Sequence, residues 1–438
     1  MVDTIANESP TYSSVSNEQR SLTREQKEAV GLLSIGTFLE YFDLMLYVHM
    51  AVLLNDLFFP KTDPYMSSLV NAFTFSVPFL LRPIGAYFIG RIGDQLGRRF
   101  TVVITSLLTA ITCLVIATLP VYNDIGIIAS CILMICRVVQ GIASLGEIIG
   151  AEIYITETIN SDAKYPAVTF IYFSSVLGGC VALAVAALTT KYYLNWRIAF
   201  WIGLGVAIFG FVARSHLRET PEFADARIAL KKIDKNIKVA LPTERSNKLS
   251  ILAMFCIQCT WPIWFYLNYF HCQNILTNNF QYTQADVLAH NFILSAVDII
   301  GIGVMIYLSC IFNPIKILQV KTAIFTPFCL ILPFLLNNVT SPLFLLCVQS
   351  FIALFSVSTM PAFPIFIKHF SVFKRFTIVN MTFAISRALI YVITSVGFVY
   401  LVKVFGNYGL LFVIVPVIIG YIFGLFHFEK LEKGEIYN

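Results

Sequence analysis

Two carboxyl side chains near the amino terminus lie on one face of a predicted apolar helix. Glu40 and Asp43 follow Gly36 and precede Tyr47, a spacing that places these residues on the same helical face. Ionisable groups at the middle depth of a membrane are costly, and they commonly face a polar cavity in which they pair or exchange protons. We therefore predict that Glu40 and Asp43 bind and release protons. The structural alternative is a permanently ion-paired carboxyl that holds helices together.

A second polar stripe occurs in the fourth apolar segment and contains Arg137 and Glu147. Arg137 and Glu40 both lie about ten residues into their segments, so we expect them to meet near the midplane, where Arg137 modulates the proton sites. Glu147 lies about 15 Å from Arg137 along the axis, so we predict that it joins the proton-coupling set without pairing with Arg137. Glu152 and Glu157 lie nearer the end of the segment, where solvation or a gating contact is expected.

A glycine-spaced charged turn lies between the second and third apolar segments. It reads Gly-Arg-Ile-Gly-Asp-Gln-Leu-Gly-Arg-Arg from Gly90 to Arg99. Glycine permits a tight turn that brings Asp94 close to cationic or helix-terminal partners, while Arg98 and Arg99 are expected to face the cytoplasm. A loop that only carries positive charge would explain the arginines but not the glycine spacing. The predicted cytoplasmic gate consists of Gly90, Gly93, Asp94, Gly97, Arg98 and Arg99.

An aromatic face of the seventh apolar segment is the first candidate for solute contacts. Trp261, Trp264 and Asn268 have the spacing of one helical face. Aromatic faces attract quaternary ammonium groups by cation–π interaction, although aromatic residues also serve helix packing at membrane interfaces. Tyr47, on the first helix, completes this group of predicted substrate contacts.

Arg387 is a further predicted substrate contact, and a buried structural pair with Asp298 is its alternative role. Cys256 and Cys259 form a lone CxxC without a second cysteine pair or nearby histidines, so no metal site is predicted. The sequence has no Walker-type phosphate loop, nucleophile elbow or HExxH motif. We therefore expect neither an enzyme nor a cofactor.

The elements that must position these side chains are apolar. Of the 438 residues, 58% are hydrophobic and 13% are charged, whereas soluble domains carry roughly 25% charged residues. A helix needs about 20 apolar residues to cross a membrane. The sequence predicts an all-α membrane protein with twelve spans, near residues 30–54, 66–90, 100–120, 126–153, 166–189, 197–215, 249–270, 286–310, 315–336, 342–367, 376–402 and 407–427.

A basic polar segment divides these spans six from six. Lys and Arg gather in alternate loops, and the positive-inside rule then predicts that both termini are cytoplasmic. Because the net charge of +5 is spread over short loops, no nucleic-acid partner is expected. The predicted domains are a cytoplasmic amino-terminal segment (1–28), a six-helix bundle (29–215), a cytoplasmic linker (216–248), a second six-helix bundle (249–428) and a cytoplasmic tail (429–438).

Several runs of sequence resemble the metabolite:proton symporter family of the major facilitator superfamily. Besides the turn described above, they are Gly36-Thr-Phe-Leu-Glu40-Tyr-Phe-Asp43, Phe58-Phe59-Pro60, the run from Ser76 to Gly85, and Arg218-Glu-Thr-Pro-Glu-Phe223. Within this family the chain is most similar to proline/betaine transporters, which import compatible solutes with protons. In the second half, the loop from Tyr307 to Lys316 lacks the Asp and paired Arg of the usual repeated signature.

The resemblance implies a proton-coupled symporter of a proline- or betaine-type solute in the bacterial inner membrane. The implied partners are the solute, protons and the lipid bilayer, and a monomer is compatible with the sequence. An organic-acid:proton symporter is the alternative, favoured if Arg82, Arg137 and Arg387 all line the cavity. A non-transporting membrane receptor or sensor is an alternative of another class, which the divergent second half permits.

Overall fold

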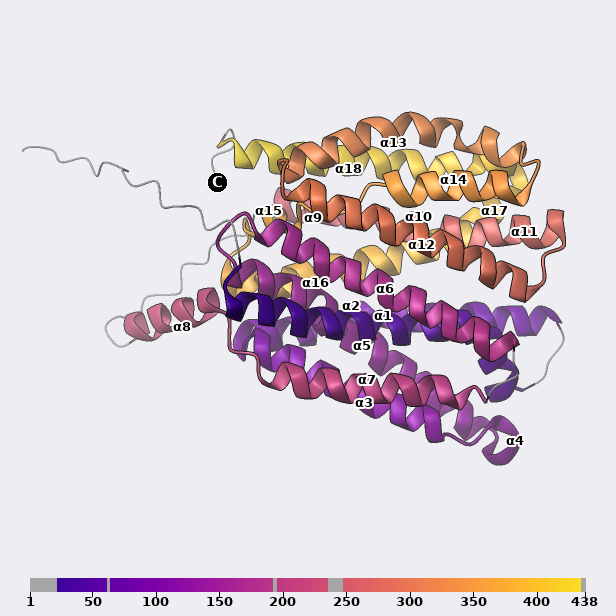
Figure 1. The fold of residues 1–438 in the computed structure, drawn as a ribbon, viewed down its shortest axis with the longest axis horizontal. Coiled ribbons are helices and arrows are strands. Elements are labelled where there is room, and N and C mark those ends of the chain that lie inside the picture. The colour runs from indigo at the N-terminus through magenta and orange to yellow at the C-terminus, as the bar shows by residue number, and fades with distance from the viewer. Residues whose placement is uncertain (1–21, 61–63, 192–194, 235–246, 435–438) are drawn as a thin grey trace, which may run out of the picture.

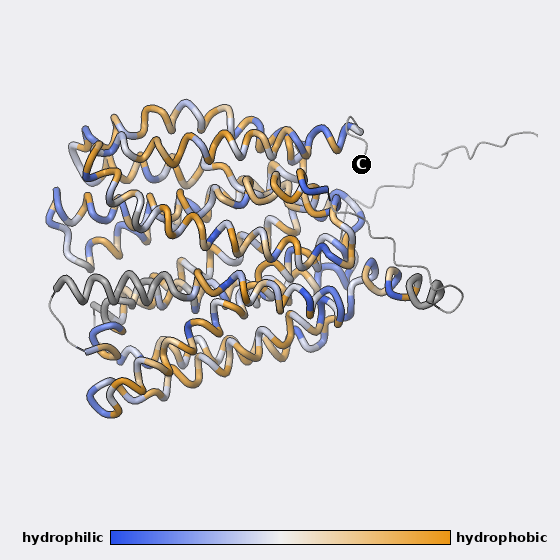
Figure 2. The backbone as a smooth tube through the Cα atoms, turned by 180° about the vertical axis from the view of Figure 1, so that it is seen from behind, coloured by the Kyte–Doolittle hydropathy of each residue, from blue (hydrophilic) through white to orange (hydrophobic). Residues whose placement is uncertain are grey.

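The computed structural model describes residues 22–60, 64–191, 195–234 and 247–434, and this part of the chain folds into helices without strands. Most of the helices run along one common axis (Figure 1). Apolar residues dominate their central stretches, and hydrophilic residues gather toward their ends (Figure 2). Many large apolar side chains are exposed, as Ile135, Ile300 and Phe412 are, so the bundle is a lipid-facing body.

The first half of the chain contains six long helices. They are α1 (Arg24–Phe58), α2 (Pro64–Gln95), α3 (Arg98–Thr118), α5 (Ile127–Thr158), α6 (Lys164–Lys191) and α7 (Arg197–Ser215), with a short α4 (Tyr122–Ile125) before α5. Thr23 and Gln26 form a capping box at the start of α1. Gly97, with φ of 114°, makes the sharp turn from α2 into α3 that only glycine adopts readily.

The second half contains more interrupted helices. The first crossing is built from α9 (Lys248–Gln258), α10 (Thr260–Tyr266), the π-helical η1 (Leu267–His271) and α11 (Cys272–Phe280). The following elements are α12 (Gln284–Ser309), α13 (Pro314–Asn337), α14 (Pro342–Phe355), α15 (Phe363–Ile367), α16 (Val372–Val392), η2 (Ile393–Phe398), α17 (Val399–Phe405), η3 (Gly406–Leu410) and α18 (Leu411–Glu432). Non-helical backbone separates α14 from α15 at membrane depth, which is tolerated where protein or a cavity surrounds it.

The described helices account for the twelve expected crossings. Nine segments are long and apolar enough to span a membrane, and the last of them, Val372–Glu432, reverses direction at η3 and so crosses twice. The helix α2 and the interrupted pair α14 and α15 provide the remaining two crossings (Figure 1). Two contacts join the halves laterally, α2 with α16 and α6 with α12.

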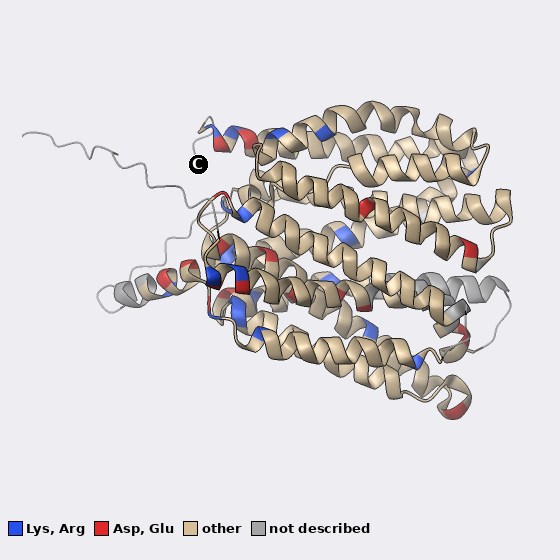
Figure 3. Cartoon of the chain, in the orientation of Figure 1, with Lys and Arg blue, Asp and Glu red and all other residues tan. Residues whose placement is uncertain are grey.

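One end of the bundle, which we call the linker end, gathers the chain segments between the halves. The helix α8 (Pro221–Asp234) projects from it, and the last turn of α18 lies there (Figure 1). The start of α1 lies there too, since Gln26 donates to the Thr158 carbonyl and Glu25 pairs with Arg218. Figure 3 shows Lys and Arg residues concentrated at this end.

Candidate functional site

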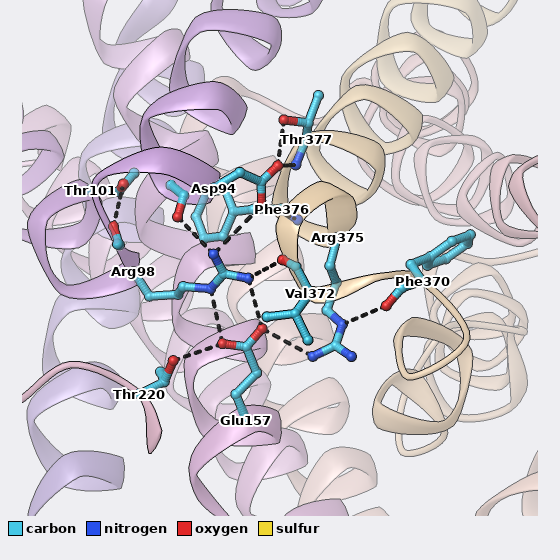
Figure 4. A network of polar contacts seen from close by, with 12 residues as sticks. Asp94, Arg98, Thr101, Glu157, Thr220, Phe370, Val372, Arg375, Phe376 and Thr377 are labelled. Atoms are coloured by element: carbon cyan, nitrogen blue, oxygen red, sulfur yellow. Dashed lines mark hydrogen bonds and ion pairs between the residues drawn. The ribbon is translucent and has the colours of Figure 1, made fainter. Parts of the chain in front are cut away.

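The predicted gate lies at the linker end, where it joins the two halves. The Asp94 carboxylate accepts hydrogen bonds from the backbone N–H groups of Phe376 (3.1 Å) and Thr377 (2.9 Å), and from the Thr377 hydroxyl (2.6 Å; Figure 4). These donors belong to the first turns of α16, where a helix favours a negative charge. A Cβ on Gly90 would lie 2.7 Å from the Thr377 Cα, so glycine here permits the close approach of α16.

Arg98 is buried at the centre of the gate, which corrects the expectation that it faces the cytoplasm. Its guanidinium makes two bonds to Glu157 (2.9 and 3.0 Å) and donates to the carbonyls of Gly93 (2.8 Å) and Val372 (2.7 Å; Figure 4). The side chain is 0% exposed. Burial is tolerated because a bidentate carboxylate and two carbonyls satisfy the charge. Arg99 is exposed, as expected.

Glu157 contacts both halves at the linker end, and the gating contact was one of its two expected roles. Besides Arg98, its carboxylate accepts from Arg375 (3.0 Å), at the start of α16, and from the Thr220 hydroxyl (2.9 Å). One buried carboxylate therefore ties α5 to α3, to α16 and to the chain that follows α7. Because Arg375 comes from the second half of the chain, this contact also closes the two halves against each other.

The beginning of the predicted linker is part of the gate, which the sequence analysis did not foresee. Glu219 accepts from the backbone N–H of Arg98 (2.9 Å) at the start of α3, and Glu222 pairs with Arg375 (3.0 Å). The ring of Phe223 lies 4.5 Å from the Arg98 guanidinium carbon. In the sequence, the feature that pointed to this role was the run at 218–223, which resembles the metabolite:proton symporter family.

A cluster of buried charges lies inside the first half. Its carboxyl members are Glu40, Asp43 and Glu147, and its guanidinium members are Arg82, Arg137 and Arg214, all at most 5% exposed. The proton-coupling residues predicted from α1 and α5 therefore do come together in space. Arg214, at the end of α7, is the member that sequence analysis missed, because it lies at the edge of its apolar segment and was counted as a loop charge.

Glu147 has a permanent partner in this cluster. Its carboxylate lies 2.9 Å from the Arg214 guanidinium and accepts 3.0 Å from the Thr109 hydroxyl. Arg214 also donates to the Ser106 hydroxyl (2.6 Å). A Cβ on Gly36 would lie 1.6 Å from the Arg214 guanidinium carbon, so this glycine on α1 makes room for the ion pair.

Arg137 lies beside Asp43 rather than Glu40, and this corrects the expected midplane contact. Its guanidinium carbon is 3.8 Å from the centre of the Tyr47 ring, and it donates to the Gln140 amide (2.7 Å). The Asp43 carboxylate interacts electrostatically with Arg137 and accepts from the Cys113 thiol (3.2 Å). Tyr47 supports Arg137 and is not among the residues that line the described cavities, which argues against its predicted role as a substrate contact.

Glu40 is the carboxyl of the cluster without a fixed partner. It is 3% exposed, and among the described residues no hydrogen bond or ion pair to its carboxyl is found. Its electrostatic neighbours are Glu147 and Asp43, which share its sign, and Arg82 and Arg214, which oppose it. A carboxyl without a hydrogen bond or ion pair can take up or release a proton without first breaking such an interaction.

A cavity of about 120 Å³ lies between the halves and adjoins this region. Three of the predicted substrate contacts, Trp261, Trp264 and Asn268, line it. The indole N–H of Trp264 and the amide oxygen of Asn268 are buried there and have no hydrogen-bond partner among the described residues. Trp261 is less available, because its ring stacks on Phe265 and the Arg387 guanidinium carbon lies 4.9 Å from its centre.

Arg387 lies outside this cavity and does not pair with Asp298, in contrast to the alternative considered above. It donates to the Gln258 carbonyl (2.8 Å) and lines two smaller adjoining cavities. Asp298 lines the larger cavity, where its charged neighbour is Lys321 of α13. Lys321 was also missed, because it lies within two turns of the start of its helix and was counted with the loop charges.

Comparison with known proteins identifies the family. The sequence profile of the Major Facilitator Superfamily matches residues 33–389, which is most of the chain, and the protein belongs to this superfamily. The superfamily membership expected from the first helix and from the Gly90 to Arg99 turn is thereby confirmed.

Individual relatives are named as transporters rather than enzymes, as expected. The "Proline/betaine transporter" of Escherichia coli (strain K12) is 35% identical over 204 residues, which cover 45% of this chain and 41% of that relative. The chain thus spans less than half the length of this relative. The "Inner membrane metabolite transport protein YhjE" of the same strain is 30% identical over 312 residues, covering 68% of this chain and 69% of the relative.

Among solved structures, the proton:xylose symporter XylE bound to 6-bromo-6-deoxy-D-glucose has a similar fold. Its TM-score is 0.73 at 16% identity, and the match covers 93% of this chain and 95% of that one. The likeness concerns the fold alone, and it agrees with the twelve-helix membrane architecture.

Proposed function

We propose that this chain is a proton-coupled symporter that carries a small zwitterionic solute of the proline or betaine type across a bacterial inner membrane. The names of its sequence relatives support the solute class. The concentration of Lys and Arg at the linker end supports a cytoplasmic location for that end and for both termini (Figure 3).

The buried carboxyl Glu40 is the observation that carries the proposal. Burial disfavours the charged form of a carboxyl, and like charges add to this effect, whereas nearby cations oppose it. Both kinds of neighbour surround Glu40, and no hydrogen bond from the described residues holds it in one state. A rearrangement of helices within the first half that changes these distances would therefore change its affinity for a proton. Asp43 is the second proton site. Arg137 lies beside Asp43 and modulates its proton affinity. The Glu147–Arg214 ion pair contributes to the electrostatic surroundings of both sites.

The gate provides the second requirement of symport, which is alternating access. In the described state, Asp94, Arg98 and Glu157 close the linker end by binding residues of α16. Release of solute at that end requires these contacts to break while the cavity closes on the opposite side. Coupling follows if proton binding at Glu40 and Asp43 is a condition for this exchange.

An organic-acid symporter is the second candidate. Its predicted signature was a cavity lined by Arg82, Arg137 and Arg387. Arg82 and Arg387 line a small adjoining cavity, but Arg137 lines none of the described cavities. The receptor hypothesis finds less support, because a sensor has no need of both a buried proton site and a gate that joins the halves.

Uptake by the purified protein in proteoliposomes tests the proposal. The panel contains radiolabelled proline, betaine, 2-oxoglutarate and citrate, each with and without an inward proton gradient. We expect accumulation of proline or betaine that requires the gradient. Accumulation of only the organic acids would show that the solute is an organic acid instead. Uptake that is independent of the proton gradient would contradict proton coupling. Failure to transport any solute, with binding retained, would favour the receptor.

A further inference from the structure

The pair of opposite charges in the second half, Asp298 and Lys321, serves none of the roles assigned above. Asp298 projects from α12 and Lys321 from α13, and both line the cavity between the halves. Each is partly exposed although it lies deep in the bundle. Charges at this depth are costly, and they commonly mark a substrate or ion pathway.

The two side chains face the same cavity without closing on each other. They interact electrostatically, yet no ion pair within 4.0 Å and no hydrogen bond of either side chain is found among the described residues. Asp298 lies about 17 Å along α12 from Ser309, and Lys321 lies about 10 Å along α13 from Pro314. Counted from these two helix ends, the Cα atoms therefore differ in depth by roughly 6 Å.

A structural ion pair would look different. The pair of Glu147 and Arg214 is closed at 2.9 Å, and further hydrogen bonds satisfy both partners. Buried charges are retained for stability only when their geometry is good and their remaining hydrogen-bonding capacity is satisfied. Asp298 and Lys321 are separated and have no ion pair or hydrogen bond among the described residues, so their charges remain available to a ligand in the cavity.

The surroundings of the pair suit a ligand that carries both signs of charge. Tyr172 and Tyr269 line the cavity close enough to Asp298 to interact with it electrostatically, and aromatic rings favour an organic cation. Since one water needs roughly 10–15 Å³ of such volume, about 120 Å³ accommodates on the order of eight to twelve atoms of that size, which is sufficient for proline or betaine.

We propose that Asp298 and Lys321 form the zwitterion-binding subsite, with Asp298 compensating the ammonium group and Lys321 binding the carboxylate of the solute. This inference rests on the proposed solute class and assigns it to particular residues. The subsite selects zwitterions because a ligand with only one charge leaves the other side chain uncompensated in the cavity. It lies in the second half, whereas the proposed proton sites lie in the first.

Binding of radiolabelled betaine to the purified full-length protein tests the subsite, with two competitors that each lack one charge. 3,3-Dimethylbutyrate replaces the ammonium nitrogen by carbon, and choline replaces the carboxylate by a hydroxymethyl group. In the unmodified protein, both should compete far less well than betaine. Asp298→Asn should raise the Kd for betaine roughly tenfold to a hundredfold and lower that for 3,3-dimethylbutyrate, because no uncompensated carboxylate then remains beside this ligand. Lys321→Gln should raise the Kd for betaine in the same way but should not raise the Kd for choline. Lys316→Gln, an exposed lysine of the same helix, is the matched control and should change no Kd by more than about twofold.

The double variant Asp298→Asn/Lys321→Gln separates a subsite from a structural pair. Because it leaves no uncompensated charge, it is expected to assemble even where a single variant does not. The subsite predicts that it still binds betaine weakly and no longer distinguishes betaine from either competitor. Recovery of the original Kd for betaine would overturn the inference and make the pair structural. If the unmodified protein binds 2-oxoglutarate but neither proline nor betaine, both the subsite and the proposed solute class are overturned. If betaine binding is unchanged in all variants, only the subsite is overturned.

Discussion

At the scale of single residues, the buried charges of the first half divide by how firmly each is held. Glu147 is fixed by Arg214 and by the Thr109 hydroxyl. Asp43 has the Cys113 thiol and the Gln140 side chain as hydrogen-bond partners, and Glu40 has none among the described residues. A carboxylate bonded to a guanidinium must break that bond before it takes up a proton, whereas one without a donor is free to change its charge when its surroundings move. This order favours Glu40 as the proton carrier and Glu147 as a structural member of the cluster.

Asp94 belongs to the same scale, because one carboxylate holds the start of α16. Asp94→Asn replaces an acceptor-only group by an amide whose NH2 would point at backbone donors, so we expect the closed gate to weaken. The variant should insert normally, take up solute at least several-fold more slowly, and label more readily at the linker end. Asp124→Asn, an exposed residue of α4, is the control. Unchanged uptake together with unchanged accessibility of both ends would refute the latch.

At the scale of elements, small residues determine how closely the helices approach. A Cβ on Gly93 would meet the Phe376 ring at 2.5 Å, and one on Gly178 would meet the Phe38 carbonyl oxygen at 2.0 Å. The first contact brings α2 against α16, and the second brings α6 against α1. The positions of the gate and of the charge cluster therefore depend on glycines that carry no chemistry of their own.

Gly36 provides the sharpest test of this dependence. Gly36→Ala would place a methyl group 1.6 Å from the Arg214 guanidinium carbon, so Arg214 must move and its bond to Glu147 must lengthen or break. We expect a loss of roughly 1–3 kcal/mol in the free energy of unfolding, seen as a lower Tm of the purified protein. Gly31→Ala is the control in the same helix, since nothing lies within 4 Å of its Cβ. Equal Tm values for the two variants would contradict the proposed role of Gly36.

The helices themselves could be predicted from the sequence, because the length and hydropathy of a span are local properties. The gate turn and the carboxyl stripe on α1 were also recognisable from spacing alone. Arg214 and Lys321 were not, because each lies close to the end of an apolar segment, where a basic residue ordinarily reaches solvent. The burial of Arg214 depends on partners from other helices, and Lys321 lines a cavity that other helices complete. The role of Glu219 and Glu222 could not be predicted either, because it depends on contacts with other helices. The sequence around them is polar enough to be a solvated linker.

At the scale of the whole molecule, the two halves are built alike but do different work. The first half holds the buried charge cluster and the gate turn between α2 and α3. The corresponding connection between α12 and α13 has Asn313 as the helix cap and lacks a charged turn of the same kind. The second half contributes the interrupted helices and most of the cavity lining. This asymmetry agrees with the proposal that the first half binds protons and the second half binds the solute.

The orientation of the molecule in the membrane is a second property of the whole. A cysteine placed at Ser13 should react with a membrane-impermeant maleimide only after cells are opened, because the basic linker end is expected inside. Asp124→Cys, near the opposite end of the bundle, should react in intact cells, and the unmodified protein gives the background of the native cysteines. Labelling of Ser13→Cys from outside intact cells would overturn the topology.

The central claim, that Glu40 and Asp43 couple protons to solute, is tested most directly by accumulation under an imposed pH gradient without a membrane potential. In proteoliposomes, Glu40→Gln and Asp43→Asn should abolish accumulation, while at least one of them retains solute counterflow, which needs no net proton release. Asp56→Asn, an exposed residue of the same helix, should behave like the unmodified protein in both assays. If both neutral variants still concentrate solute, these carboxyls are structural and coupling lies elsewhere.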